Sequence, residues 1–246
     1  MLSTPKVSGL PAAYLSGSIT GRYKADVLAE HAGFAGDLAK RVTVFSPMRS
    51  KTDVPDGLLA TSFFENSLFA SPRAIVARNV GDIRRCGTFA CNLTHGDKVS
   101  VGSLLELGVA HALGRQIVVA ITPGGAHDHP HVHALANTVT HSVEELAHVV
   151  GKRAPKATPD PDMAQRIYQQ TPFVFAKGAP LVFDLRDQKT VNIHALVAIG
   201  QAYALHYPAL VVMEEHGNPH DHSMLRQMAH VFSTHTEARR LLSPHH

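Results

Sequence analysis

The residues best suited to chemistry stand together at 99–114. The order is Val-Ser-Val-Gly-Ser-Leu-Leu-Glu-Leu-Gly-Val-Ala-His-Ala-Leu-Gly, with one carboxylate at Glu106. Glycine and serine open a predicted helix over residues 101–113, and the backbone N–H groups at a helix start hold anions well. Glu106 is therefore a candidate reacting group in the first turn or so of that helix. The alternative is a glutamate that only complements the helix dipole.

A second candidate segment is Gly17-Ser-Ile-Thr-Gly21-Arg22, which follows a predicted strand containing Tyr14. It is not a P-loop, because no Gly-Lys-Ser/Thr follows. Its backbone N–H groups, the Ser18 hydroxyl and Arg22 could face a phosphate. The alternative is an ordinary turn after a strand.

Three further polar residues occupy positions where a ligand could be met. Asn92 ends a predicted strand, so a substrate contact and a turn-capping role are both open. Ser100 precedes the helix of Glu106, where a simple N-cap is the alternative. Asn79 lies in a predicted helix, with Asp82 one turn further on. Asp82 could share the face of Asn79, but we expect it to be solvated on the helix surface.

Short β-rich runs alternate with helical patterns, which predicts a flavodoxin/Rossmann-like parallel sheet with helices on both faces. In such folds ligands bind at the carboxyl ends of the strands. We expect loops at 49–59 and after residue 121. The strands are predicted at 13–16, 42–45, 88–93, 117–121 and 138–140. The helices are predicted at 24–40, 63–85 (as one helix or as two around Ser71-Pro72), 101–113 and 143–150.

The second half of the chain repeats part of the first. With a shift of 92 positions, residues 86–113 align without a gap on 178–205, and with one more position His127 falls on His220 and Glu144 on Glu237. A chance match of two βαβ pieces is the alternative. We predict a domain over 1–150, a linker over 151–161 and a degenerate half-repeat over 162–246. The position matching Glu106 is an alanine, so the repeat is not a second active site of this kind.

Composition narrows the class of protein. The 246 residues are 44% hydrophobic and 17% charged, which is enough for a sizeable core. No apolar run is long enough to span a bilayer, and no secretory signal is recognisable. Two cysteines and a net charge of +3 favour a soluble cytoplasmic protein with no membrane and no duplex nucleic acid as partner.

Histidines alternate with other residues at His127, His129, His131 and His133, beside Asp128. Imidazoles with a carboxylate could bind zinc or nickel. We expect instead a solvated loop, and neither a metal nor a cofactor.

Five segments occur together in the order seen in nucleoside 2-deoxyribosyltransferases. The chain resembles this superfamily, which includes the 2′-deoxynucleoside 5′-phosphate N-hydrolases, over residues 10–150. The segments are Tyr14-Leu-Ser-Gly-Ser18, Phe45-Ser-Pro-Met48, Arg78-Asn-Val-Gly-Asp-Ile-Arg-Arg85, Cys91-Asn-Leu93 and Ser100-Val-Gly102-Ser-Leu-Leu-Glu-Leu-Gly108. By this resemblance Glu106 attacks C1′ of the sugar of a nucleoside or nucleotide, and water or a second base then takes the glycosyl group.

The resemblance also assigns roles to other residues. Tyr14 matches the tyrosine that orients the nucleophile. The segment from Gly17 to Gly21 resembles the phosphate-binding Gly-Ser-Ile-x-Gly of the N-hydrolases. Ser100 stands where those enzymes carry serine and nucleoside-specific transferases carry aspartate, which implies a nucleotide substrate.

One departure weakens the match. The superfamily usually places an aspartate after the arginine of the third helix, to handle the leaving base, and here that residue is Asn79. Asparagine hydrogen-bonds but cannot deliver a proton as a carboxylic acid does. A nucleotide-binding module without turnover is therefore the second hypothesis.

Members of the superfamily resemble one another in closing each active site with a neighbouring subunit. The half-repeat implies an intrachain pseudo-dimer in which helix 101–113 pairs with helix 193–205, and a homo-oligomer is also open. Small residues on both helices permit close approach, among them Gly108 and Gly200.

Overall fold

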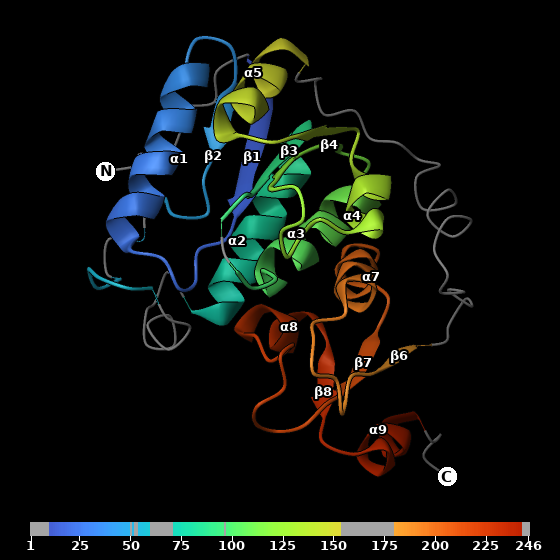
Figure 1. Ribbon diagram of the computed structural model, residues 1–246. Coiled ribbons are helices and arrows are strands. Elements are labelled where there is room, and N and C mark those ends of the chain that lie inside the picture. Colours follow the sequence, from blue (N-terminus) through green and yellow to red (C-terminus); the bar gives the residue numbers. More distant parts are fainter. Residues whose placement is uncertain are drawn as a thin grey trace.

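The computed structural model describes residues 10–49, 51, 54–59, 71–95, 97–153 and 180–242. Its first unit is built on a parallel sheet in the order β2-β1-β3-β4-β5 (Figure 1). The strands are β1 (Ala12–Gly17), β2 (Thr43–Phe45), β3 (Thr88–Leu93), β4 (Gln116–Ile121) and β5 (Thr138–Thr140). The predicted α/β class is confirmed, and all five strand positions agree with the sequence pattern to within one residue.

Helices cover both faces of this sheet because its side chains alternate. On β1, Ala13 and Leu15 join a core with α1 (Lys24–Leu38) and α5 (Val143–Arg153), whereas Tyr14 belongs to the core on the other face. That other face is covered by α2 (Pro72–Arg85) and α3 (Val101–Ala112). The carboxyl ends of β1 and β3 therefore meet the start of α3 at one edge of the sheet.

The second unit repeats β3 to α5 of the first. It contains β6 (Leu181–Asp184), α7 (Ile193–Ala204), β7 (Ala209–Val212), α8 (Ser223–Met228), β8 (His230–Phe232) and α9 (His235–Leu242). The strands form a parallel sheet in the order β6-β7-β8. The element α4 (Pro130–Leu135) matches α8, so the repeat covers six consecutive elements.

The extra position in the repeat applies only to α8 and the loop before it, because β7 aligns with β4 at a shift of 92. Glu145 Oε2 accepts from His141 N at 2.9 Å, and Glu237 Oε2 accepts from Ser233 N at 3.1 Å, a match at 92 positions. The counterpart of Glu237 is therefore Glu145, and the predicted alignment with Glu144 is wrong by one residue.

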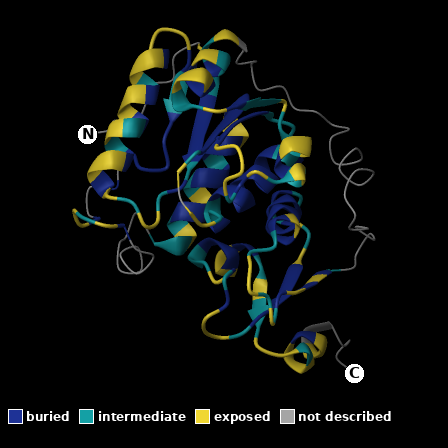
Figure 2. Cartoon of the chain, in the orientation of Figure 1, coloured by how far each residue is buried: buried dark blue, intermediate teal, exposed yellow. Residues whose placement is uncertain are grey.

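Helices α3 and α7 pack directly against each other, as predicted from their small residues. A Cβ added to Gly108 would lie 2.1 Å from Val197 O, and one added to Gly200 would lie 2.1 Å from Leu105 O. Because the same two positions of the repeat are exchanged, the contact has the reciprocity of a two-fold interface. Both helices are almost wholly buried (Figure 2).

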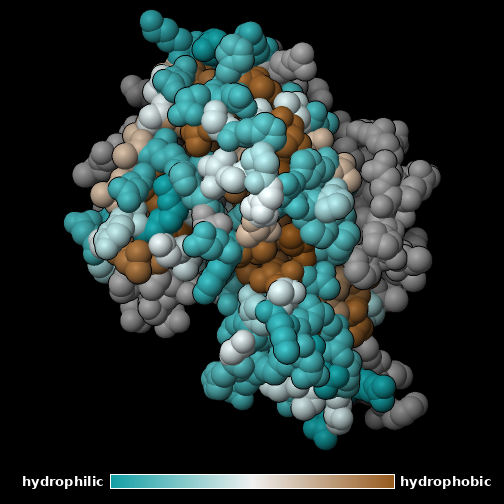
Figure 3. All heavy atoms as spheres, in the orientation of Figure 1, coloured by the Kyte–Doolittle hydropathy of each residue, from teal (hydrophilic) through white to brown (hydrophobic). Residues whose placement is uncertain are grey.

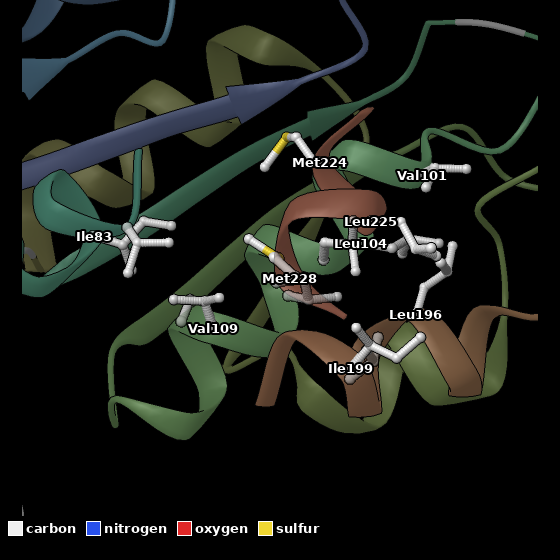
Figure 4. Packing of buried hydrophobic residues seen from close by; sticks show 14 of the residues in the cluster. Ile83, Val101, Leu104, Val109, Leu196, Ile199, Met224, Leu225 and Met228 are labelled. Atoms are coloured by element: carbon white, nitrogen blue, oxygen red, sulfur yellow. The ribbon is translucent and has the colours of Figure 1, made fainter. Parts of the chain in front are cut away.

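Helix α8 of the second unit packs against α2 and α3 of the first unit and against α7. Leu225 and Met228 lie among Leu104, Val109 and Ile199 in one continuous core (Figure 4). On the outer surface, hydrophobic residues gather where the two units meet, above a mainly hydrophilic second unit (Figure 3). The two units therefore share one hydrophobic core.

Some predicted boundaries differ from the structure. Helix α5 continues to Arg153, so the predicted linker does not begin at residue 151, and its remainder lies outside the described residues together with 162–179. Residues 63–70 of a predicted helix are also outside them. The short helix α4 was missed because six residues carry too little periodicity, although His129 and Pro130 supply its cap and first position.

No helix in the described ranges is long and apolar enough to cross a membrane.

Candidate active site

Glu106 is buried at the centre of a three-donor hydrogen-bond set. It is 4% exposed and lies in the second turn of α3, facing the sheet. Tyr14 Oη donates to Oε1 at 2.9 Å and Ser16 Oγ to Oε2 at 2.6 Å. Asn79 Nδ2 donates to Oε1 at 2.7 Å. Glu106 does more than complement the helix dipole, because that effect falls off within the first turn and three side chains from other elements hold this carboxylate.

Three different elements supply these donors. Tyr14 and Ser16 are two residues apart on β1, so their side chains lie on the same face of the sheet, while Asn79 projects from α2. The predicted contact of Tyr14 with Glu106 is what the structure shows. Ser16 was not predicted, although its place two residues after Tyr14 on a strand was a usable signal.

Burial sets the electrostatics of this cluster. It raises the pKa of Glu106, while the bonds from Ser16, Tyr14 and Asn79 and the charge of Lys51 act in the opposite direction. Burial, followed by the Glu106 charge, raises the pKa of Tyr14 well above its usual value, so its hydroxyl remains a donor. The carboxylate is thus partly desolvated but held in one orientation.

A pocket opens beside this carboxylate. Ile75 and Pro47 give it apolar wall, and Lys51 brings a cation. The rest of its first-unit lining is Gly17, Ile19, Thr20, Asn79, Ser100, Gly102, Ser103 and Glu106. The second unit contributes His222, Ser223 and Met224.

The predicted phosphate loop is only partly at the pocket. Gly17 lines it and packs on β3, where an added Cβ would lie 2.9 Å from Asn92 O. Ser18 is buried, and Gly21 has a φ of 84°, which favours glycine. Arg22 does not line the pocket, because its guanidinium pairs with Glu30 at 2.8 Å.

The three other predicted contacts divide in the same way. Ser100 and Gly102 line the pocket, and Ser100 Oγ lies 2.9 Å from Ser103 Oγ without capping the helix. Asn92 is turned elsewhere: its Nδ2 donates to Glu30 at 2.7 Å and its Oδ1 accepts from Thr94 N at 3.1 Å. Of the two readings of Asn92, the turn-capping one matches its contacts.

Asn79 and Asp82 have distinct environments. Asn79 lines the pocket, and its Oδ1 is buried with no hydrogen-bond partner among the described residues. Asp82 is fully buried and pairs with Arg49 and Arg85, so the expectation that it is solvated is wrong. It does not line the pocket and cannot replace the missing carboxylic acid there.

The alternating histidines have structural contacts. His127 is buried, and its Nε2 accepts from Ser100 N at 2.8 Å. The expectation of a solvated loop is therefore wrong at this residue. His129 caps α4, and His133 pairs with Asp128 at 2.6 Å. Within the described ranges, no group of three His, Cys, Asp or Glu side chains could hold a metal ion.

Sequence reasoning did not find Lys51 or the residues of the second unit. Lys51 stands in a segment without periodicity, so nothing in the pattern pointed to it. Predicting His222 would have required knowing how the repeat folds onto the first unit.

Comparison with known proteins does not add a family to this description. Neither a scan against protein-family models nor a search of the curated proteins finds a match for the chain.

Proposed function

We propose that the protein cleaves or transfers at the N-glycosidic bond of a 2′-deoxynucleoside or its 5′-monophosphate, with Glu106 as the nucleophile. The observation that carries this is a buried carboxylate, fixed by three donors, at the wall of a pocket that also holds a cation. The resemblance of the motifs to nucleoside 2-deoxyribosyltransferases supports the same reaction.

The chemistry follows from the properties of a carboxylate nucleophile. One oxygen of Glu106 attacks C1′ as the bond from C1′ to the base breaks, through an oxocarbenium-like transition state. The product is a glutamyl ester of the sugar, and the departing base takes a proton from solvent. Water or a second base then attacks C1′, the ester bond breaks and the Glu106 carboxylate is restored.

The three donors serve this reaction by orientation. Ser16, Tyr14 and Asn79 keep Glu106 in one rotamer, which lowers the entropy to be lost in the transition state. They also stabilise the ionised form that attacks. Asn79 cannot supply a proton to the base, but its unpartnered Oδ1 can accept a hydrogen bond from the ligand.

A phosphate preference rests on the charge of the pocket. The start of α3, the hydroxyls of Ser100 and Ser103 and the ammonium of Lys51 all border it. Because Lys51 lines the pocket and Arg22 does not, Lys51 is the stronger candidate for a phosphate contact. A charge-assisted contact contributes about 1.5–3 kcal/mol.

The test compares Lys51→Ala with Arg22→Ala as its matched control. We expect Lys51→Ala to raise KM for monophosphates by about tenfold or more over its effect on nucleosides, and Arg22→Ala to affect both equally. A larger monophosphate-specific effect of Arg22→Ala would return the phosphate contact to Arg22.

The second candidate is a binding module without turnover, which Asn79 favours because it stands where the superfamily carries the carboxylic acid that handles the leaving base. Incubation with four deoxynucleosides and their monophosphates, with and without a second free base, separates the two. Released base, or a sugar adduct on Glu106 found by mass spectrometry, supports the enzyme. Binding without either supports the module.

A further inference from the structure

The second unit reaches the candidate pocket through the segment that begins α8. A Cβ added to Gly102 would lie 3.3 Å from His222 Cε1 and 3.6 Å from His222 Nε2. Gly102 precedes Glu106 by four residues, so the two lie on one face of α3 about one turn apart. The imidazole of His222 therefore stands over the pocket wall one helical turn from the carboxylate.

The hydrogen bonds of this imidazole fix where its proton lies. Met224 N donates to His222 Nδ1 at 3.2 Å, so Nδ1 presents a lone pair and the neutral ring carries its hydrogen on Nε2. Burial lowers the pKa of His222 to about 4, which keeps the ring neutral at pH 7. Within the part of the chain that the structure describes, Nε2 has no hydrogen-bond partner.

The repeat offers a natural comparison for this histidine. His129 matches His222 and caps its own short helix in the same way, accepting from His131 N at 3.1 Å. Its ring meets His194, the counterpart of Gly102, with ring centroids 5.1 Å apart. Capping therefore explains both histidines. Of the two, only His222 packs against a glycine, Gly102, and lines the pocket.

We propose that His222 is a substrate-contacting residue, supplied by the second unit, whose Nε2–H donates a hydrogen bond to an oxygen of the bound nucleoside or nucleotide. This inference rests on the proposed function. The oxygen belongs to the sugar or its 5′ group, because His222 lies on the N-terminal side of Glu106, near the hydroxyls of Ser100 and Ser223. A neutral imidazole at this place orients the substrate and transfers no proton.

The test uses His222→Asn in the full chain. Asparagine is among the best N-cap residues, so the cap of α8 is kept while the Nε2–H donor is lost. His129→Asn makes the same change at the matching position of the repeat. Deoxynucleosides and their monophosphates are the probes, with KM and kcat measured separately, binding measured in the Glu106→Ala background, and Tm as the check on folding.

We expect His222→Asn to raise KM or Kd about tenfold with little change in Tm, and His129→Asn to leave both unchanged. Equal losses in the two variants would show that the histidines act through packing and would overturn the proposal. So would a His222→Asn protein with wild-type KM and Kd. If no probe binds or reacts with the wild-type protein, the proposed function is wrong and this inference falls with it, whereas wild-type turnover with an unaffected His222→Asn overturns this inference alone.

Discussion

The two units share six elements in the same order, yet they use matching positions in opposite ways. In the first, Ser100 leaves its helix start uncapped, Gly102 leaves space and Glu106 is a buried acid. In the second, Asn192 caps α7, accepting from Ala195 N at 3.0 Å, and His194 fills the place of Gly102. The counterpart of Glu106 is Ala198, which is buried in the core.

The comparison shows that the first unit has a pocket at the positions where the second unit has stabilising contacts. A capped helix start and an apolar residue facing the core are both stabilising. An uncapped start and a desolvated carboxylate are not, and such costs are typical of functional sites. The second unit contributes packing and one wall of the pocket, and the first unit keeps the groups that can react.

The largest effect should come from removing the group that distinguishes the two units most. Glu106→Ala makes the first unit equal to the second at this position. We expect base release to be lost while ligand affinity stays within about tenfold, roughly 1.4 kcal/mol, because the nucleophile acts mainly in the transition state. Turnover assays and calorimetric binding check this. More than about a tenth of wild-type turnover would rule out Glu106 as the nucleophile.

A large loss of stability should follow from disturbing the contact that the two units share. Gly108→Ala would place its Cβ against the Val197 carbonyl, so we expect destabilisation by more than about 3 kcal/mol in denaturant unfolding. Gly33→Ala is the control, since that helical glycine has open space around it and should gain about 0.5–1 kcal/mol. Similar effects at both positions would show that the close helix contact contributes little.

A smaller effect should come from converting the open pocket wall to the filled one. Gly102→His recreates in the first unit the residue that the second unit has, and the new ring would meet His222. We expect about a tenfold or greater rise in KM with kcat less affected. The reciprocal change His194→Gly should leave turnover as it is. Unaltered KM in Gly102→His would mean that substrate does not use this wall.

The smallest expected effect is on pH dependence, because among the described residues the first unit has buried acids and the second has none. Because the pKa of Glu106 is raised, kcat/KM should fall on the acid side at a pH above the ordinary glutamate value. Because the pKa of Glu106 is raised in the folded state, folding favours the protonated side chain. The stability gained from this is complete at pH values below the pKa of the unfolded state and is lost as pH rises through the pKa of the folded state.

Glu106→Gln should therefore gain stability relative to wild type over the pH range above the ordinary glutamate pKa, as seen in Tm at several pH values. A constant Tm difference across this range would indicate an unshifted Glu106. Ala198→Glu, which places an acid in the second unit, provides the reverse comparison and should lose stability as pH rises.

The sequence by itself determined the elements and their order. The short, mainly apolar runs of β1, β3, α3 and α7 record burial, which is a local pattern visible along the chain. The repeat followed from the same pattern, as did the contact of α3 with α7, because glycines at matching positions allow close approach. Glu106 was found through its Ser-x-Gly-x-x-x-Glu-x-Gly setting, which α3 holds in one helix.

Only the tertiary structure decided which polar groups face Glu106. Arg22 and Asn92 belong to the motif segments of the sequence but bind Glu30 and do not line the pocket. Lys51 and His222 lie outside those segments and line it. Asp82, expected on the surface, is buried between two arginines. The direction of a side chain depends on charges and packing from other elements, and neither propensity nor spacing along the chain carries that information.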